Sequence, residues 1–271
     1  MLSSRDKYEK YRPKKRLGQN FLVDNNIAGK IVNALEIRDS DLVLEIGPGQ
    51  GALTKHLVKQ AKNFIAVEID SFAADSITEK FGKELNLILK DFLEFDFVND
   101  LEQFDSGLTL KVIGNIPYNI TSDILFKLLD NSEIVTTAVL MIQREVAERL
   151  YAKRGTKQYG ILAVQFQAFA GVKKVVSVPP AAFFPKPDVH STVLKIDFCK
   201  ESTEITDKKL FREFVRKAFS KRRKTLKNSL KEFFETHNIT SEDFDFDFGR
   251  RAESLEIKEF IKLSNMIAAM K

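Results

Sequence analysis

Residues 42–51 read Leu42-Val43-Leu44-Glu45-Ile46-Gly47-Pro48-Gly49-Gln50-Gly51, and this stretch decides the fold. Its first half is rich in branched apolar residues, which is typical of a short buried strand. The glycines that follow allow a tight turn and a close approach of the backbone to a ligand. Helical spacing resumes after Gly51, and the free N–H groups of a helix start suit an anionic or polar ligand. The stretch therefore predicts a ligand site where a strand turns into a helix.

Short apolar runs alternate with helical patterns on both sides of this turn. Strands are predicted at 42–46, 64–67, 85–89, 110–113 and 135–142. Helices are predicted after Asp24, which has the character of an N-cap, after Gly51, over 71–81 and over 122–129. This alternation predicts an α/β fold with a mostly parallel sheet, helices on both faces and a ligand at the carboxyl ends of the strands.

The chain changes character near residue 200. Two further strands are predicted at 172–178 and 192–198, on either side of a proline-rich loop at 179–187. From Asp207 onward the apolar residues have only helical spacing. We therefore expect one domain over 1–200 and a small all-helical C-terminal domain over 201–271.

Composition excludes several classes of protein. The chain has one cysteine, Cys199, and three widely separated histidines, which predicts neither a disulfide framework nor a metal site. No apolar run reaches the ~18 residues that a membrane span needs. The polar, basic segment 1–16 argues against a secretory signal. We expect a cytoplasmic, metal-free protein that does not enter a membrane.

Positive charge is concentrated in two segments. The net charge is +5; residues 208–231 hold eleven Lys or Arg and one acid, Glu213, while residues 1–16 hold seven bases and two acids. A single cluster of this kind is usually only a solvated helix face. Two clusters together indicate a polyanionic partner, with nucleic acid favoured.

Acidic residues near the glycine turn indicate the type of cofactor. Glu68 ends the second strand, where a carboxylate can accept both hydroxyls of a ribose. An NAD dehydrogenase would share this pattern and stays an alternative. Glu45 favours S-adenosylmethionine, because an acid there can hold the ammonium group or tune the loop around a cationic sulfonium. Asp91, after the third strand, can accept from the adenine amino group of the cofactor. A local cap is the alternative role for Asp91.

The segment Asn115-Ile116-Pro117-Tyr118 ends the fourth strand and indicates methylation of an amino group on a base. The adenine N6 lone pair is delocalised, so two acceptors on its hydrogens would draw the nitrogen toward tetrahedral geometry. The Asn115 side-chain oxygen and the Ile116 carbonyl can be those acceptors, and Pro117 restricts the backbone between them. Tyr118 can stack on an extruded base, and Phe184 in the later loop can cover its other face.

Nine short motifs resemble, in order, the small-subunit ribosomal RNA adenine dimethyltransferases, the KsgA/RsmA family. The resemblance runs from about Lys14 to the C-terminus. The motifs read KRLGQNFL at 15–22, EIGPGQG at 45–51, VEID at 67–70, NIPYNIT at 115–121, QREVA at 143–147, YG at 159–160, FPKP at 184–187, AFSKRRKTL at 218–226 and RAE at 251–253. Ile116 is a minor departure, since leucine is frequent there among relatives and a backbone acceptor tolerates either.

The resemblance implies a Rossmann-like class I methyltransferase domain that uses S-adenosylmethionine. Asn20 and Leu22 would line the methionine end of the cofactor with Gln19 nearby. The remaining residues of that site would be Glu45, Gly47, Gly49, Glu68, Asp91 and Asn115.

The resemblance also implies the substrate. The family transfers two methyl groups to the N6 of each of two adjacent adenosines, in a hairpin near the 3′ end of small-subunit (16S) rRNA within the immature 30S particle. The C-terminal domain would help to dock this particle, with Arg222, Arg223 and Lys224 as RNA-binding residues, and we expect a monomer.

Two alternatives stay open at this point. A large-subunit rRNA adenine methyltransferase of the macrolide-resistance type would share residues 115–118, although residues 143–147 and 222–226 look more like the small-subunit branch. The chain can also act mainly by binding, as a ribosome-assembly factor.

Overall fold

The computed structural model describes residues 18–82, 85–105, 107–198 and 205–270, so the basic segment 1–16 and Cys199 lie outside the described residues. Within these ranges the chain divides into two compact units. The first unit comprises Met1–Ala147 and Lys173–Cys199, and the second comprises Glu148–Val172 and Lys200–Lys271, so far as they are described.

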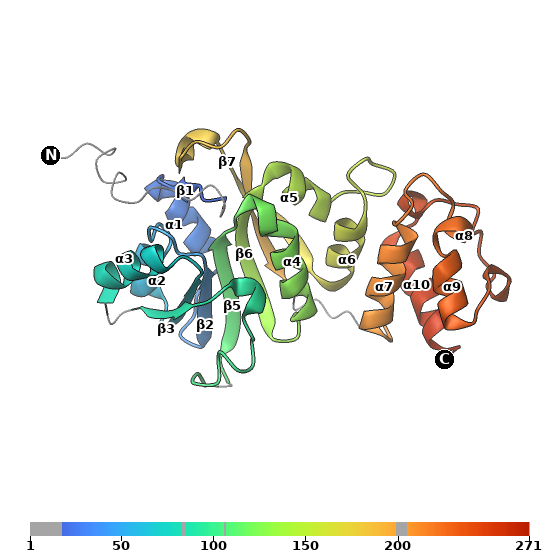
Figure 1. Ribbon diagram of the computed structural model, residues 1–271, viewed down its shortest axis with the longest axis horizontal. Helices are drawn as coiled ribbons and strands as arrows, with labels where there is room; N and C mark the ends of the chain where they lie inside the picture. Colours follow the sequence, from blue (N-terminus) through green and yellow to red (C-terminus); the bar gives the residue numbers. More distant parts are fainter. Residues whose placement is uncertain (1–17, 83–84, 106, 199–204, 271) are drawn as a thin grey trace. The chain divides into compact units, whose positions relative to one another are not determined.

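A seven-stranded sheet forms the centre of the first unit, in the spatial order β4-β3-β2-β5-β6-β9-β7 (Figure 1). Strands β4, β3, β2, β5 and β6 run parallel, and β9 runs antiparallel to β6. The sequence-based prediction of a mostly parallel sheet is confirmed. The strands are β2 (Asp41–Ile46), β3 (Asn63–Glu68), β4 (Asn86–Leu89), β5 (Thr109–Asn115), β6 (Val135–Gln143), β7 (Gly171–Val178) and β9 (Ser191–Asp197).

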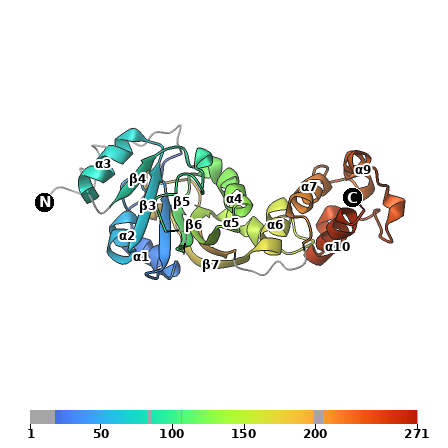
Figure 2. The same ribbon diagram turned by 90° about the horizontal axis from the view of Figure 1, so that it is seen from below.

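Helices cover both faces of this sheet. Figure 2 shows α1 and α2 on one face and α4 on the other. Asp24 caps α1 by accepting from the N–H groups of Asn26 and Ile27, as the sequence predicts. Asp70 caps α3 in the same way through the N–H of Phe72. The helices are α1 (Asn25–Ala34), α2 (Thr54–Gln60), α3 (Ser71–Phe81), α4 (Thr121–Asp130) and α5 (Arg144–Leu150), within which the first unit ends.

The main hydrophobic core lies between the sheet and the first three helices. Alternate strand residues such as Val43, Ile113 and Val139 point into it, because side chains alternate between the two faces of a strand. Ile31 of α1 and Ile77 of α3 pack against them and are essentially inaccessible to solvent. The parallel register pairs Ile46 of β2 with Val67 of β3 and with Gly114 of β5, so the carboxyl ends of these strands lie level with one another.

A small two-stranded antiparallel sheet, with two residues in each strand, joins segments that are distant in the sequence. Strand β1 (Phe21–Leu22) pairs with β8 (Phe183–Phe184), with Phe21 opposite Phe184. The N–H of Val23 donates to the Ala182 carbonyl at 2.8 Å and extends the pairing. The proline-rich segment predicted as a loop therefore contains a strand, and its partner strand was not predicted either.

The second unit is helical and has an aromatic core. Phe214 of α7 lies 5.7 Å from Phe233 of α9 and 6.2 Å from Phe260 of α10, measured between ring centroids. The predicted absence of strands after Asp207 holds for the described residues of this segment. The helices are α6 (Ile161–Phe169), α7 (Lys208–Ala218), α8 (Leu226–Ser229), α9 (Lys231–His237) and α10 (Ile257–Ala268).

The unit boundaries differ from the predicted domain boundaries in one segment. The second unit includes the chain from Lys200 onward, and residues 148–172 group with it as well. Contacts explain the difference: Phe169 of α6 packs edge-on against Phe211 of α7, with ring centroids 5.6 Å apart. The Tyr159 hydroxyl also donates to the Leu255 carbonyl at 2.9 Å. Sequence order alone does not reveal such long-range packing.

Candidate active site

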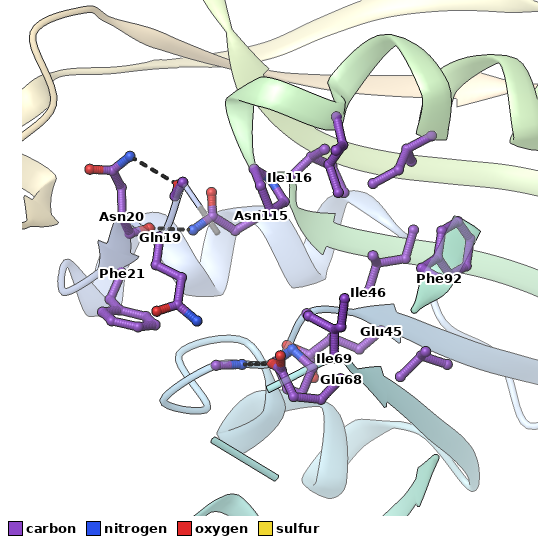
Figure 3. Close-up of a pocket in the computed structure, with 18 of the residues that line it drawn as sticks. Gln19, Asn20, Phe21, Glu45, Ile46, Glu68, Ile69, Phe92, Asn115 and Ile116 are labelled. Carbon is purple, nitrogen blue, oxygen red and sulfur yellow. Dashed lines mark hydrogen bonds between the residues drawn. The ribbon is translucent and has the colours of Figure 1, made fainter. Parts of the chain in front are cut away.

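A cavity of about 260 Å³ opens at the carboxyl ends of the parallel strands in the first unit. Its wall comes from β1, the turn after β2, and the ends of β3, β4 and β5 (Figure 3). Twelve of the residues predicted to act in catalysis or cofactor binding line it together. These are Gln19, Asn20, Leu22, Glu45, Gly47, Gly49, Glu68, Asp91, Asn115, Ile116, Pro117 and Tyr118.

The glycine turn after β2 needs its glycines for two different reasons. Gly47 and Gly49 both have positive φ angles, of 62° and 54°, which residues with a Cβ rarely adopt. A Cβ on Gly49 would lie 3.0 Å from the Phe21 ring, so this glycine admits the aromatic side chain of β1. A Cβ on Gly47 would meet no atom within 4 Å, which leaves open space for a ligand at that point.

Glu68, at the end of β3, is tied into the same turn. Its two carboxylate oxygens accept from the backbone N–H of Gly49 at 3.0 Å and of Asp70 at 2.9 Å. Burial raises the pKa of Glu68, and these hydrogen bonds oppose the shift. Each oxygen has a second lone pair, so the carboxylate can also accept from two hydroxyl groups in the cavity.

Glu45 lies beneath the turn. Its Oε2 accepts from the Thr54 hydroxyl at 2.7 Å, and the residue is only 1% exposed. Burial raises the pKa of Glu45 to about 8, so the group is mainly protonated at neutral pH. This arrangement favours shaping of the loop over direct pairing with an ammonium group, the two roles that the sequence suggested.

Asp91 has both of the features that the sequence left open. Its Oδ1 accepts from the N–H of Leu93 at 2.8 Å and so caps the 3₁₀ turn η3 (Phe92–Glu94). The residue also lines the cavity beside Phe92. Contact with a cofactor adenine stays a prediction for Asp91.

Asn115 is the last residue of β5 and faces the residues before β1. Its Nδ2 donates to the backbone carbonyl of Asn20 at 2.8 Å, as Figure 3 shows. This bond uses the nitrogen of the amide and leaves its oxygen as an acceptor. The Ile116 N–H donates to the Met141 carbonyl at 3.0 Å, which anchors the following residue to β6. The side-chain amide of Asn115 is thus held by Asn20, and the backbone that follows it is held by β6.

Gly18 and Gln19 place the segment that leads into β1 beside the cavity, through contacts that no local sequence pattern predicts. Gly18 has a φ of 61°, and a Cβ there would lie 2.7 Å from Asn119 Oδ1. Gln19 Nε2 donates to Asp70 Oδ2 at 3.2 Å. The segment therefore approaches both the 115–119 loop and the end of β3.

Tyr118 has a partner that sequence reasoning missed. Its hydroxyl lies 2.8 Å from the hydroxyl of Ser191, the first residue of β9, which has no solvent-accessible surface. Burial raises the pKa of Tyr118. The Thr121 hydroxyl donates to the Pro117 carbonyl at 3.0 Å and fixes the turn before it. A serine inside an apolar strand carries no sequence signal for such a role.

Phe184 does not line the cavity. It lies opposite Phe21 in the β1–β8 pair and is 39% exposed, whereas Phe21 itself is a lining residue. Covering of an extruded base by Phe184 stays a prediction.

The predicted RNA-binding residues belong to the second unit. Arg222 Nε lies 3.3 Å from Glu253 Oε2, and its guanidinium also donates to the Lys157 carbonyl. Arg223 and Lys224 are exposed. All three side chains are exposed, and Arg222 additionally contacts Glu253 and Lys157 within its own unit.

No group of three or more His, Cys, Asp or Glu side chains among the described residues is placed to hold a metal ion. None of the helices in the described part of the chain is long and apolar enough to cross a membrane.

Comparisons with known proteins agree on one family. The family model described as ribosomal RNA adenine dimethylase matches residues 11–269. A ribosomal RNA small subunit methyltransferase A from Chlorobaculum parvum is 47% identical over 250 residues, covering 92% of this chain and 88% of that protein.

Solved structures show the same architecture. A dimethyladenosine transferase from Plasmodium falciparum superposes with a TM-score of 0.74 at 28% identity, covering 92% of this chain and 98% of that one. The 23S rRNA methyltransferase ErmE superposes with a TM-score of 0.68 at 23% identity, covering 92% of this chain and all of that one. The second likeness supports the fold alone.

Proposed function

The chain belongs to the ribosomal RNA adenine dimethylase family, and from this premise we propose that it dimethylates N6 of two adjacent adenosines in small-subunit (16S) rRNA. The methyl donor is S-adenosylmethionine and the substrate is the immature 30S particle. Relatives that are 47% identical to this chain are named for the small subunit, so the macrolide-resistance alternative is not favoured. We further propose that the protein acts as a monomer in the cytoplasm, where its substrate assembles.

The cavity fits S-adenosylmethionine in the chemistry of its donors. The open space at Gly47 admits a ligand against the backbone, and the Glu68 carboxylate can accept the two ribose hydroxyls. Asp91 can accept from an exocyclic amino group, and Asn20 and Leu22 also line the cavity. When bound, the cofactor supplies an electrophilic methyl group on a sulfonium sulfur.

The single observation that carries the proposal is the orientation of the Asn115 amide. Because its Nδ2 donates to the Asn20 carbonyl at 2.8 Å, its oxygen is the atom left to accept from the N6 hydrogens of a target base. The Ile116 carbonyl is the second acceptor, and the ring of Tyr118 is the stacking surface. Two acceptors on one amino group localise its lone pair and aim it at the methyl carbon.

The methyl transfer requires no strong general base. The N6 lone pair forms the new C–N bond as the C–S bond breaks, and the electron pair of that bond stays on sulfur. The nitrogen then carries a positive charge, becomes acidic and gives its proton to water. The residues of the chain therefore contribute position and electrostatic stabilisation.

The first experiment is a methyl-transfer assay on purified ribosomal particles. The protein is incubated with labelled S-adenosylmethionine and, in separate reactions, with immature small subunits that lack this modification and with naked large-subunit rRNA, and the RNA is digested for mass analysis. We expect N6,N6-dimethyladenosine at two neighbouring positions. Label found only in large-subunit rRNA would support the resistance-type alternative, and particle binding without any label would support the assembly-factor alternative.

A further inference from the structure

Ser191 is a buried hydroxyl that touches the proposed target-base site from a different strand. It begins β9 and pairs with Gln143 of β6 across the antiparallel ladder. Its side chain has no solvent-accessible surface, and its Oγ lies 2.8 Å from the Tyr118 hydroxyl. A polar group buried this completely needs a hydrogen-bond partner, and Tyr118 is the one that the structure gives it.

This contact holds the tyrosine ring at both ends. The backbone end is fixed because Pro117 restricts φ and its carbonyl accepts from Thr121 at 3.0 Å. The hydroxyl end is fixed to Ser191 in the central sheet. Anchoring both ends fixes the axis of the ring, and because hydrogen bonds of a phenol hydroxyl prefer to lie in the ring plane, the bond to Ser191 also restrains rotation about that axis. The ring therefore presents a preorganised surface to a base.

Neighbouring Thr192 shows that the contact is specific to position 191. Thr192 is also fully buried, yet its hydroxyl makes no hydrogen bond among the described residues. Consecutive strand residues point to opposite faces of the sheet, so only residue 191 is directed toward Tyr118. Substitution of Thr192 is therefore a matched control for substitution of Ser191.

The plane of the ring matters unequally in the two methyl transfers to one adenosine. An unmodified adenine offers two N6 hydrogens to the two acceptors, the Asn115 side-chain oxygen and the Ile116 carbonyl. After the first transfer only one hydrogen remains, so one of these hydrogen bonds is lost and stacking must hold the base. The second transfer therefore depends more strongly on the ring of Tyr118.

We propose that Ser191 is a positioning residue that fixes the ring of Tyr118 and thereby promotes the second of the two methyl transfers. This inference rests on the proposed function. It concerns residues of the chain and the target base, and it does not require a change in cofactor binding.

The test is the product ratio of four variants on immature small subunits: Ser191→Ala, Tyr118→Phe, the double variant and Thr192→Val as control. Mass analysis gives the ratio of N6-monomethyladenosine to N6,N6-dimethyladenosine at partial conversion. We expect Ser191→Ala and Tyr118→Phe each to raise this ratio about three- to tenfold, the range for loss of one neutral hydrogen bond. Thr192→Val should keep the wild-type ratio.

The double variant separates positioning from a general structural role. If Ser191 acts through the tyrosine hydroxyl, adding Ser191→Ala to Tyr118→Phe changes nothing further. A fully additive effect would overturn the proposal, as would a wild-type ratio in the folded Ser191→Ala variant. Each variant should unfold cooperatively, with Ser191→Ala and Tyr118→Phe less stable than wild type by the loss of one buried hydrogen bond, while cofactor affinity by calorimetry should match the wild type within error.

Two outcomes keep this inference distinct from the proposed function. If Ser191→Ala does not fold, Tyr118→Phe leaves β9 intact, and a wild-type product ratio there would refute the idea. If the wild-type protein makes no methylated adenosine at all, the proposed function fails first. Normal wild-type products with unchanged ratios in the variants would refute only the role of Ser191.

Discussion

Replacing Glu68 by glutamine tests the cofactor site most directly, because the substitution keeps the size of the side chain. The two carboxylate oxygens accept from Gly49 at 3.0 Å and Asp70 at 2.9 Å. An amide has one oxygen, so it can satisfy only one of these N–H donors and turns its own N–H group toward the other. A ribose hydroxyl then loses one charged acceptor, worth about 1.5–3 kcal/mol. The dissociation constant should rise about 10- to 150-fold.

Calorimetry with S-adenosylmethionine and with S-adenosylhomocysteine measures this change, and both ligands should weaken equally because both carry the ribose. RNA affinity without cofactor should stay unchanged. Glu79→Gln, on the exposed face of α3, is the matched control and should bind normally. A folded Glu68→Gln protein with wild-type cofactor affinity would refute the ribose contact.

Three further predictions concern other parts of the chain. Asn115→Ala should lower methyl transfer roughly 100-fold while particle binding persists, by analogy with loss of one preorganised polar group at a reacting centre; labelled-methyl and filter-binding assays check it. Neutralising Arg223 and Lys224 should reduce the slope of log affinity against log salt by about two, whereas Arg222, already engaged with Glu253, should add less. Glu45 has a folded pKa of about 8 against 4.5 in the unfolded chain, so its stabilising contribution is complete below about pH 4.5 and is lost as pH rises through 8. Thermal unfolding of Glu45→Gln should therefore show a gain over wild type that grows from pH 5 to pH 8.5; a constant difference would contradict it.

Local signals account for the parts of the fold that sequence predicted well. Helix α3 spans Ser71–Phe81 as expected, because Asp70 caps it and its apolar residues recur at helical spacing. Parallel strands with continuous apolar runs were located within about two residues. Their carboxyl ends meet at one edge of the sheet, which is why the site residues from separate motifs share one cavity.

Contacts between distant segments account for what sequence did not predict. The β1 and β8 strands have two residues each, too few for any periodicity, and exist only because they pair. Segment 148–172 joins the helical unit through Phe169, and no local pattern distinguishes that ring from any other core residue. Ser191 looks like a small residue in a strand until its position beside Tyr118 is known.

The β1–β8 pair also has a consequence for synthesis of the chain on the ribosome. Its two strands are separated by about 160 residues, and β9, inserted between β6 and β7, comes later still. At ~5–20 residues per second, translation takes roughly ten to thirty seconds to cover that separation. During this interval Phe21 has emerged but its partner Phe184 has not been made. In a nascent chain, β1 can therefore pair with β8 beside the cavity only after almost all of the first unit has left the exit tunnel.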